Sequence, residues 1–285
     1  MNDLFAALLL GIIEGITEFL PVSSTGHLLI AEHFLGRHYS ALFNIAIQAG
    51  AILAVTLIYR RRLWGMLLAF AGHDAPASHD PLGVASSPAQ SRDYAFKLLA
   101  AFAVTAMFGL LVKKLGWELP DTVRPIAWAL ILGALWMMVA EQLAARRAAR
   151  DGERTSVSWT VALLVGLAQV VAGVFPGTSR SAATIFVALL AGTTSRAAAT
   201  EFAFVVGIPT MFAATGYELL SLLRHGGVGQ EDWAALGVAF IASAVVAFVA
   251  VKWLLHYIQH HRFTWFALYR FALGAALLLW LPLGS

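Results

Sequence analysis

The chain has 285 residues, of which 60% are hydrophobic and 12% charged, and it carries a formal net charge of +3. Ordinary soluble domains are about 45–50% apolar and about 25% charged, so this composition excludes a water-soluble globular protein. The small net charge gives no reason to expect a nucleic-acid partner, and the absence of cysteine excludes disulfides, thiolate metal sites and a cysteine nucleophile.

The first apolar segment, residues 4–35, is not expected to be a simple membrane span. Pro21 and a run of polar residues interrupt it, and Glu14 and Glu18 lie inside its hydrophobic part. These acids and the lack of a basic leading segment argue against a cleavable signal peptide. Because backbone may leave the helix at membrane depth only where protein or a water-filled cavity satisfies it, we predict a re-entrant helical hairpin.

The segment that follows contains three expected membrane spans, at 42–59, 95–113 and 125–143. Each is close to the roughly 20 apolar residues that cross the bilayer core. Residues 71–92, between the first two spans, are rich in Ala, Ser, Pro, His and Asp. This composition predicts a flexible cytoplasmic linker that carries no chemistry.

A second interrupted segment, residues 158–192, resembles the first. Three expected spans separate the two copies, and because this number is odd, the second copy enters from the opposite face of the membrane. We therefore predict an inverted-topology repeat, at about 1–120 and 156–285, inside a single membrane domain, 1–285. The matching residues, all offset by 155, are Gly11 with Gly166, Glu14 with Gln169, Pro21 with Pro176 and Ser24 with Ser179.

The last three expected spans are 199–221, 234–255 and 265–282. Basic residues gather beside several spans, above all at 60–62 and 146–154, and the positive-inside rule places these clusters in the cytoplasm and both termini outside. The chain is thus predicted to be an all-α, multi-pass integral membrane protein with about six transmembrane helices and two re-entrant helical hairpins.

Glu14 and Glu18 are the first candidates for chemistry. Four residues apart on a helix, they lie on one face, and two ionised carboxylates in an apolar setting repel each other. A shared proton, a divalent cation or a nearby arginine would relieve the repulsion, so we predict that both acids are catalytic and hold a metal ion. The alternative is that they line an aqueous vestibule.

The loop after Pro21 supplies hydroxyls, a flexible backbone and an imidazole. Ser24 is predicted to be a nucleophile or a donor to phosphate, and His27 a general base or acid, since its ordinary pKa is near neutrality. The alternative for His27 is a structural histidine. The residues expected to bind substrate in this loop are Ser23, Thr25 and Gly26.

The corresponding loop of the second copy has the character of an anion site. Arg180 can grip phosphate oxygens with two hydrogen bonds, and the N-terminus of the helix that follows favours anions. The alternative role for Arg180 is an ion pair with Glu14 or Glu18, which could coexist with catalysis. The residues expected to bind substrate here are Gly177, Thr178, Ser179, Ser181 and Thr184.

The two loop motifs closely resemble those of the bacterial undecaprenyl-diphosphatase family, also known as bacitracin-resistance proteins. The resemblance rests on EGITEFLPVSSTGH at 14–27 and PGTSRSAAT at 176–184, and it extends over nearly the whole chain, including Glu201-Phe and Tyr269-Arg270-Phe. Thr178 stands where some relatives carry Phe. By position, the family's acidic motif falls on Glu14 and Glu18, its Ser and His on Ser24 and His27, and its arginine on Arg180.

The resemblance implies hydrolysis of undecaprenyl diphosphate to the monophosphate, which recycles the lipid carrier for peptidoglycan and cell-wall synthesis and confers bacitracin resistance. It also implies a divalent cation, Mg²⁺ or Ca²⁺, and a site that opens toward the periplasm from the bacterial inner membrane. Because inverted repeats are typical of transporters, a polyprenyl-phosphate flippase stays open as an alternative or second activity. A homodimer also stays open.

Overall fold

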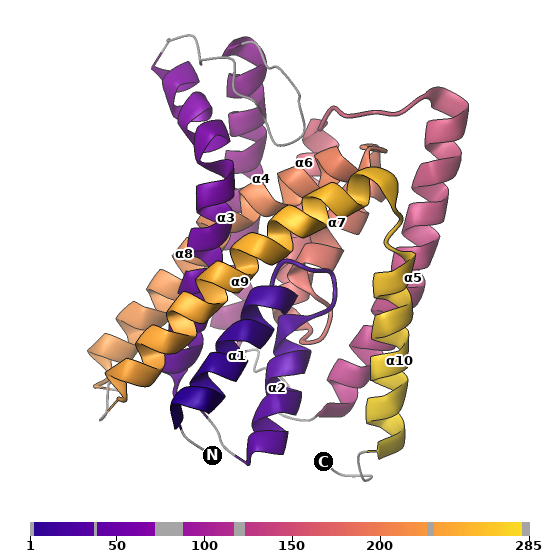
Figure 1. Ribbon diagram of the computed structural model, residues 1–285. Coiled ribbons are helices and arrows are strands. Elements are labelled where there is room, and N and C mark those ends of the chain that lie inside the picture. Colours follow the sequence, from indigo (N-terminus) through magenta and orange to yellow (C-terminus); the bar gives the residue numbers. More distant parts are fainter. Residues whose placement is uncertain (1–2, 37–38, 72–87, 117–122, 227–230, 281–285) are drawn as a thin grey trace.

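The computed structural model, shown in Figure 1, describes residues 3–36, 39–71, 88–116, 123–226 and 231–280. Every regular element within these ranges is an α-helix, which confirms the predicted all-α class. In chain order the helices are α1 (Asp3–Thr17), α2 (Ser24–Leu35), α3 (Ala41–Phe70), α4 (Pro88–Lys114), α5 (Val123–Asp151), α6 (Trp159–Val174), α7 (Arg180–Ala191), α8 (Arg196–Arg224), α9 (Trp233–His260) and α10 (Thr264–Trp280).

Five helices, α3, α4, α5, α8 and α9, are long and apolar enough to cross a membrane, and they coincide with five of the six predicted spans. The sixth prediction corresponds to α10, whose 17 residues give a length of about 25 Å, at the lower end of what spans a bilayer core. Large apolar side chains such as Met107, Leu132 and Val249 face outward, as contact with lipid requires. The chain is therefore a multi-pass membrane protein.

The predicted linker at 71–92 is wrong at its C-terminal end, because α4 already begins at Pro88. Proline suits the first position of a helix, where its missing N–H has no partner to lose. Residues 72–87, the rest of that prediction, lie outside the described residues.

Each interrupted segment forms two short helices joined by a loop: α1 and α2 flank residues 18–23, and α6 and α7 flank residues 175–179. In Figure 1, helices α1 and α2 extend from the first loop toward the side where the two chain termini lie. Helices α6 and α7 of the second hairpin lie on the opposite side of that loop. The two hairpins meet here, because the hydroxyl of Ser181, in the first turn of α7, donates to the Leu20 carbonyl of the first loop at 3.0 Å. This is the meeting of two broken segments that the sequence predicts.

Both hairpins pack closely against a long helix through a glycine. A Cβ atom at Gly11 on α1 would lie 2.5 Å from the Ala239 carbonyl oxygen of α9, and one at Gly166 on α6 would lie 2.6 Å from the Ala101 oxygen of α4. The two glycines are among the residues paired at the offset of 155. They serve the same packing purpose in both halves, while the inverted repeat itself stays a prediction.

The first loop packs against the hydrophobic core through Phe19. Phe19, in that loop, is almost completely buried and packs edge to face against Phe204 of α8, with ring centroids 5.3 Å apart. The two long helices α3 and α8 are themselves joined by a buried ion pair between Arg62 and Glu201, at 3.3 Å. Loop residues 18–23 are therefore anchored to the long helices rather than left free at membrane depth.

Candidate active site

The second helix of each hairpin begins at a strained serine. Ser23 and Ser179 are the non-glycine residues of the described chain with positive φ, at 75° and 68°. Each caps its helix: Ser23 Oγ accepts from the Gly26 N–H, and Ser179 Oγ from the Ala182 N–H. The left-handed region costs a residue with a Cβ atom about 1–2 kcal/mol, a strain found preferentially at functional sites.

These caps correct one pairing of the sequence comparison. By backbone conformation and capping role, the counterpart of Ser179 is Ser23 and not Ser24, because two residues separate Pro176 from its serine cap, whereas one residue separates Pro21 from its cap. The counterpart of Arg180 is then Ser24. Each of these two residues is the first of its helix, and each points a reactive group to the same place.

That place is the carboxylate of Glu18. Ser24 Oγ donates to Glu18 Oε2 at 2.5 Å, and Arg180 Nη2 donates to Glu18 Oε1 at 2.7 Å. One carboxylate thus holds a hydroxyl from the first hairpin and a guanidinium from the second. The ion pair considered as an alternative for Arg180 is present, and the carboxylate is in reach of the Ser24 proton.

The three side chains line a cavity of about 790 Å³. Its wall is polar around Glu18 and largely apolar elsewhere, with Phe102, Leu110 and Met211 among the residues that line it. The lining extends to Lys113, near the end of α4, and to Tyr217 and Glu218 of α8, on the side of the molecule where both termini lie in Figure 1. A polar end and an apolar wall suit a lipid with a charged head.

The cavity contains about half of the residues predicted from sequence. Besides Glu18, Ser24 and Arg180, it is lined by Ser23, Thr25, Gly177 and Ser179. It is not lined by Glu14, Gly26, His27, Thr178, Ser181 or Thr184.

His27 is turned to another side of the loop. Its Nδ1 lies 2.7 Å from the Ser23 carbonyl oxygen, to which it must donate, so Nε2 accepts from the Tyr269 hydroxyl at 2.6 Å. The two rings stack, with centroids 5.6 Å apart. Together with Trp253 and Trp265, His27 lines a separate, mostly apolar pocket of about 550 Å³. These contacts resemble those of a structural histidine, which was the alternative for His27, more than those of a general base for Ser24.

Three other predicted site residues make hydrogen bonds or packing contacts inside the protein. Thr184 Oγ1 donates to the Arg180 carbonyl at 2.8 Å, within α7, while the Ser181 hydroxyl makes the contact between α7 and the first loop described above. Gly26 faces Ile126, 3.4 Å from the position of a Cβ atom. These residues shape the loops instead of facing the cavity.

Glu14 is buried with both carboxylate oxygens lacking a hydrogen-bond partner within the described chain. Such a group calls for a proton or a cation. The described residues contain no group of three or more His, Cys, Asp and Glu side chains that could hold a metal. Two carboxylates still suit Mg²⁺, which proteins often bind through one or two acids together with substrate phosphates. Glu14 and Glu18 thus have the ligand chemistry for such a cation, although Glu18 lines the cavity and Glu14 does not.

Sequence reasoning gave no role to Gln169 and Arg270, which lie at the site. Gln169, the counterpart of Glu14, donates to Thr105 Oγ1 at 2.8 Å and lines the cavity, so the second hairpin is neutral where the first is acidic. Arg270 is completely buried and contacts both loops. An arginine inside an expected span is a signal that could have identified it.

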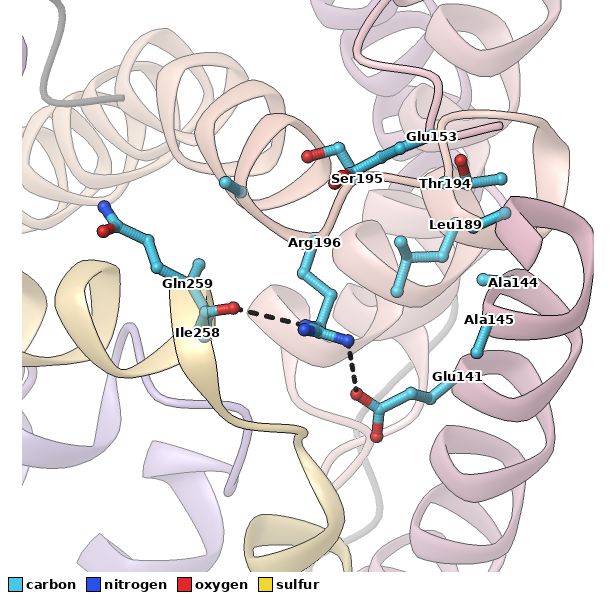
Figure 2. A pocket seen from close by; sticks show the side chains of 12 residues that line it. Glu141, Ala144, Ala145, Glu153, Leu189, Thr194, Ser195, Arg196, Ile258 and Gln259 are labelled. Atoms are coloured by element: carbon cyan, nitrogen blue, oxygen red, sulfur yellow. Dashed lines mark hydrogen bonds and ion pairs between the residues drawn. The ribbon is translucent and has the colours of Figure 1, made fainter. Parts of the chain in front are cut away.

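A second polar pocket, of about 390 Å³, lies between α5, α8 and α9. Figure 2 shows Arg196 at its centre, with Nη1 3.9 Å from Glu141 Oε1 and Nε donating to the Ile258 carbonyl at 3.2 Å. Glu141 also accepts from the Phe263 N–H at 3.1 Å. Arg196 and Glu141 are paired across helices, and none of the predicted site residues lines the pocket.

The model of a protein family described as bacitracin resistance protein BacA matches residues 7–276. The chain belongs to this family. The BacA match includes both hairpin loops and every predicted site residue, and it confirms the resemblance seen in the loop motifs.

The BacA relatives include close matches over nearly their whole length. A protein named undecaprenyl-diphosphatase from Xanthomonas oryzae pv. oryzae is 57% identical over 282 residues, covering 99% of this chain and 98% of the relative. Proteins of the same name from Rhizobium johnstonii and Rhizobium etli are each 61% identical over 276 residues, covering 97% of this chain and 96% of the relative.

Proposed function

We propose that the protein hydrolyses undecaprenyl diphosphate to undecaprenyl phosphate and inorganic phosphate in the bacterial inner membrane. The observation that carries the proposal is the Glu18 carboxylate, which holds Ser24 and Arg180 together in a cavity with a largely apolar wall. The names of the BacA relatives support the same substrate. The product would recycle the lipid carrier for peptidoglycan synthesis, and bacitracin resistance would follow from the same activity.

Arg180 is the residue that would meet the terminal phosphate. Its side chain is 20% exposed, and the paired Glu18 side chain is 12% exposed. A phosphate dianion entering the cavity competes with Glu18 for the guanidinium, since Arg can bind two phosphate oxygens at once, whereas it contacts Glu18 through the hydrogen bond from Nη2 to Oε1. This exchange frees Glu18 as a base while it places charge stabilisation on the equatorial phosphoryl oxygens.

Ser24 would then attack the terminal phosphorus. Its proton passes to Glu18, which lies 2.5 Å away, and the bond between that phosphorus and the bridging oxygen breaks, so undecaprenyl phosphate leaves. Water hydrolyses the phosphoserine and releases inorganic phosphate. We assign the base to Glu18 instead of His27 because only Glu18 contacts the attacking hydroxyl.

A divalent cation would be held by Glu14 and Glu18, and when bound it would neutralise part of the diphosphate charge. The buried, unpartnered oxygens of Glu14 support this assignment. All residues of the proposed site come from one chain, so the proposal does not depend on a homodimer.

The direct test is release of inorganic phosphate from undecaprenyl diphosphate by purified protein in detergent. We expect release in the presence of Mg²⁺ or Ca²⁺, and its loss with a chelator or in Glu18→Ala. Movement of polyprenyl phosphate across vesicles without phosphate release would instead support the flippase alternative.

A further inference from the structure

Arg270 of α10 binds the backbone of both loops. Nη1 donates to the Thr178 carbonyl at 3.0 Å and to the Pro21 carbonyl at 3.4 Å. Nη2 donates to the Gly177 and Ala129 carbonyls, each at 3.1 Å. One guanidinium therefore joins loop 18–23, loop 175–179 and α5.

This arrangement depends on the shape of arginine. The side chain is completely buried, and within the described chain its partners are all backbone carbonyl oxygens. Burying a cation without a carboxylate is costly, so the carbonyls must be fixed in the right directions. A planar fork can reach several of them at once, whereas a lysine ammonium is a point charge with a different reach.

Helix α5 has a glycine, Gly133, where it faces the Arg270 guanidinium. A Cβ atom at Gly133 of α5 would collide with Arg270 Nη2 and would lie 3.0 Å from Arg270 Cζ. Gly133 is therefore matched to the presence of Arg270, and any side chain there would displace it.

Arg270 also determines which way one peptide group faces. The C=O and N–H of a trans peptide point in opposite directions, and the described chain contains no cis peptide bond. With the Thr178 carbonyl on Arg270, the Ser179 N–H points away from Arg270. The Thr178 N–H is already used by Phe175 O at 3.2 Å, whereas the Ser179 N–H has no acceptor among the described residues, and Ser179 lines the cavity.

We propose that Arg270 is a positioning residue that locks the two loops together and holds the Ser179 N–H toward the cavity, where it donates to an oxygen of the phosphoryl group. The inference rests on the proposed function. It explains why Ser179 keeps a strained positive φ, since that conformation is maintained by Arg270 on one side and by the α7 cap on the other. A fixed donor of this kind stabilises charge that develops as phosphate is transferred.

Two variants test the positioning role, and a third is the control. Arg270→Lys keeps the charge but loses the fork, and Gly133→Ala displaces the guanidinium without changing its chemistry. Gly274→Ala strains the same α5–α10 contact away from Arg270, because its Cβ would lie 2.8 Å from the Ala127 carbonyl oxygen. We expect kcat to fall about a hundredfold or more in the first two variants, as for loss of one oxyanion donor, with KM changed less than about threefold. Gly274→Ala should keep kcat within about threefold.

Amide hydrogen exchange provides a readout that does not need activity. In Arg270→Lys, peptides covering 18–23 and 175–179 should exchange about tenfold faster or more, while α3 peptides stay unchanged. Unchanged loop exchange, or equal loss of kcat in Gly133→Ala and Gly274→Ala, would overturn the proposal. If wild type releases no phosphate, the proposed function fails, and the exchange experiment still decides whether Arg270 fixes the loops.

Discussion

At the scale of single residues, Glu18 is the point where the two halves of the site meet. It accepts a hydrogen bond from Ser24 and forms an ion pair with Arg180, and these two partners begin helices that are far apart in sequence. A neutral residue at this position would leave Arg180 without its counter-charge and Ser24 without an acceptor. Glu18 therefore acts on both reactive groups.

The guanidinium of Arg180 is expected to matter for its shape as well as its charge. In Arg180→Lys, kcat should fall about a hundredfold or more, because an ammonium cannot bind two phosphate oxygens in the bidentate way. Phosphate release and thermal unfolding of the purified variant check this. Activity within a few fold of wild type would show that a point charge is sufficient.

His27 is predicted to be less important than its place in the motif indicates. Its two nitrogens are engaged by the Ser23 carbonyl and the Tyr269 hydroxyl, outside the cavity. We therefore expect His27→Ala and Tyr269→Phe each to reduce kcat less than about tenfold, through small shifts of the loop. A loss in His27→Ala as large as that in Ser24→Ala would restore His27 as the general base.

The sequence could predict which residues are chemically interesting, but not where each one points. Ser24 and His27 are three apart on one helix, a spacing that predicts neighbours. Tyr269, which holds the ring of His27, is 242 residues away along the chain, so no local spacing could have indicated that contact. The four carbonyl groups that Arg270 contacts are also far from it along the chain, so these contacts could not be predicted from local spacing.

At the scale of elements, the hairpins depend on close approach to the long helices. Gly166→Ala should lower the free energy of unfolding by about 1–3 kcal/mol, because the added methyl group would overpack α6 against the Ala101 carbonyl of α4. Gly173, on the same helix, has nothing within 4 Å of its Cβ position and is the matched control. Thermal unfolding in detergent should therefore separate Gly166→Ala from Gly173→Ala, and equal stability of the two would contradict the packing account.

The hairpins were predictable because Pro and polar residues break an apolar run at fixed positions. The strained serines that begin α2 and α7 were less so, since positive φ normally favours glycine, and the one-residue difference between the loops shifted the pairing from Ser24 to Ser23. The beginning of α4 at Pro88 was missed because the composition of residues 71–92 resembles that of a linker.

At the scale of the whole molecule, charge and the position of the cavity predict the orientation in the membrane. The basic clusters at 60–62 and 146–154 lie at the end opposite the termini, whereas the cavity reaches Lys113 on the side of the termini. If basic loops are cytoplasmic, the cavity opens toward the periplasm.

The cysteine-free chain makes this orientation straightforward to test. In intact cells, Lys113→Cys should react with a membrane-impermeant maleimide added from outside, and Arg150→Cys, at the other end, should react only after the membrane is permeabilised. The reverse pattern would invert the topology and place the cavity on the cytoplasmic side.

The central claim is that Ser24 is the nucleophile of a lipid diphosphatase, and the most direct test is phosphate release from undecaprenyl diphosphate by Ser24→Ala beside Thr160→Ala. Thr160 is an exposed hydroxyl outside the cavity, so its loss controls for a general effect of substitution. The account predicts that Ser24→Ala loses activity about a thousandfold or more while Thr160→Ala matches wild type. Full phosphate release by a folded Ser24→Ala protein would contradict it.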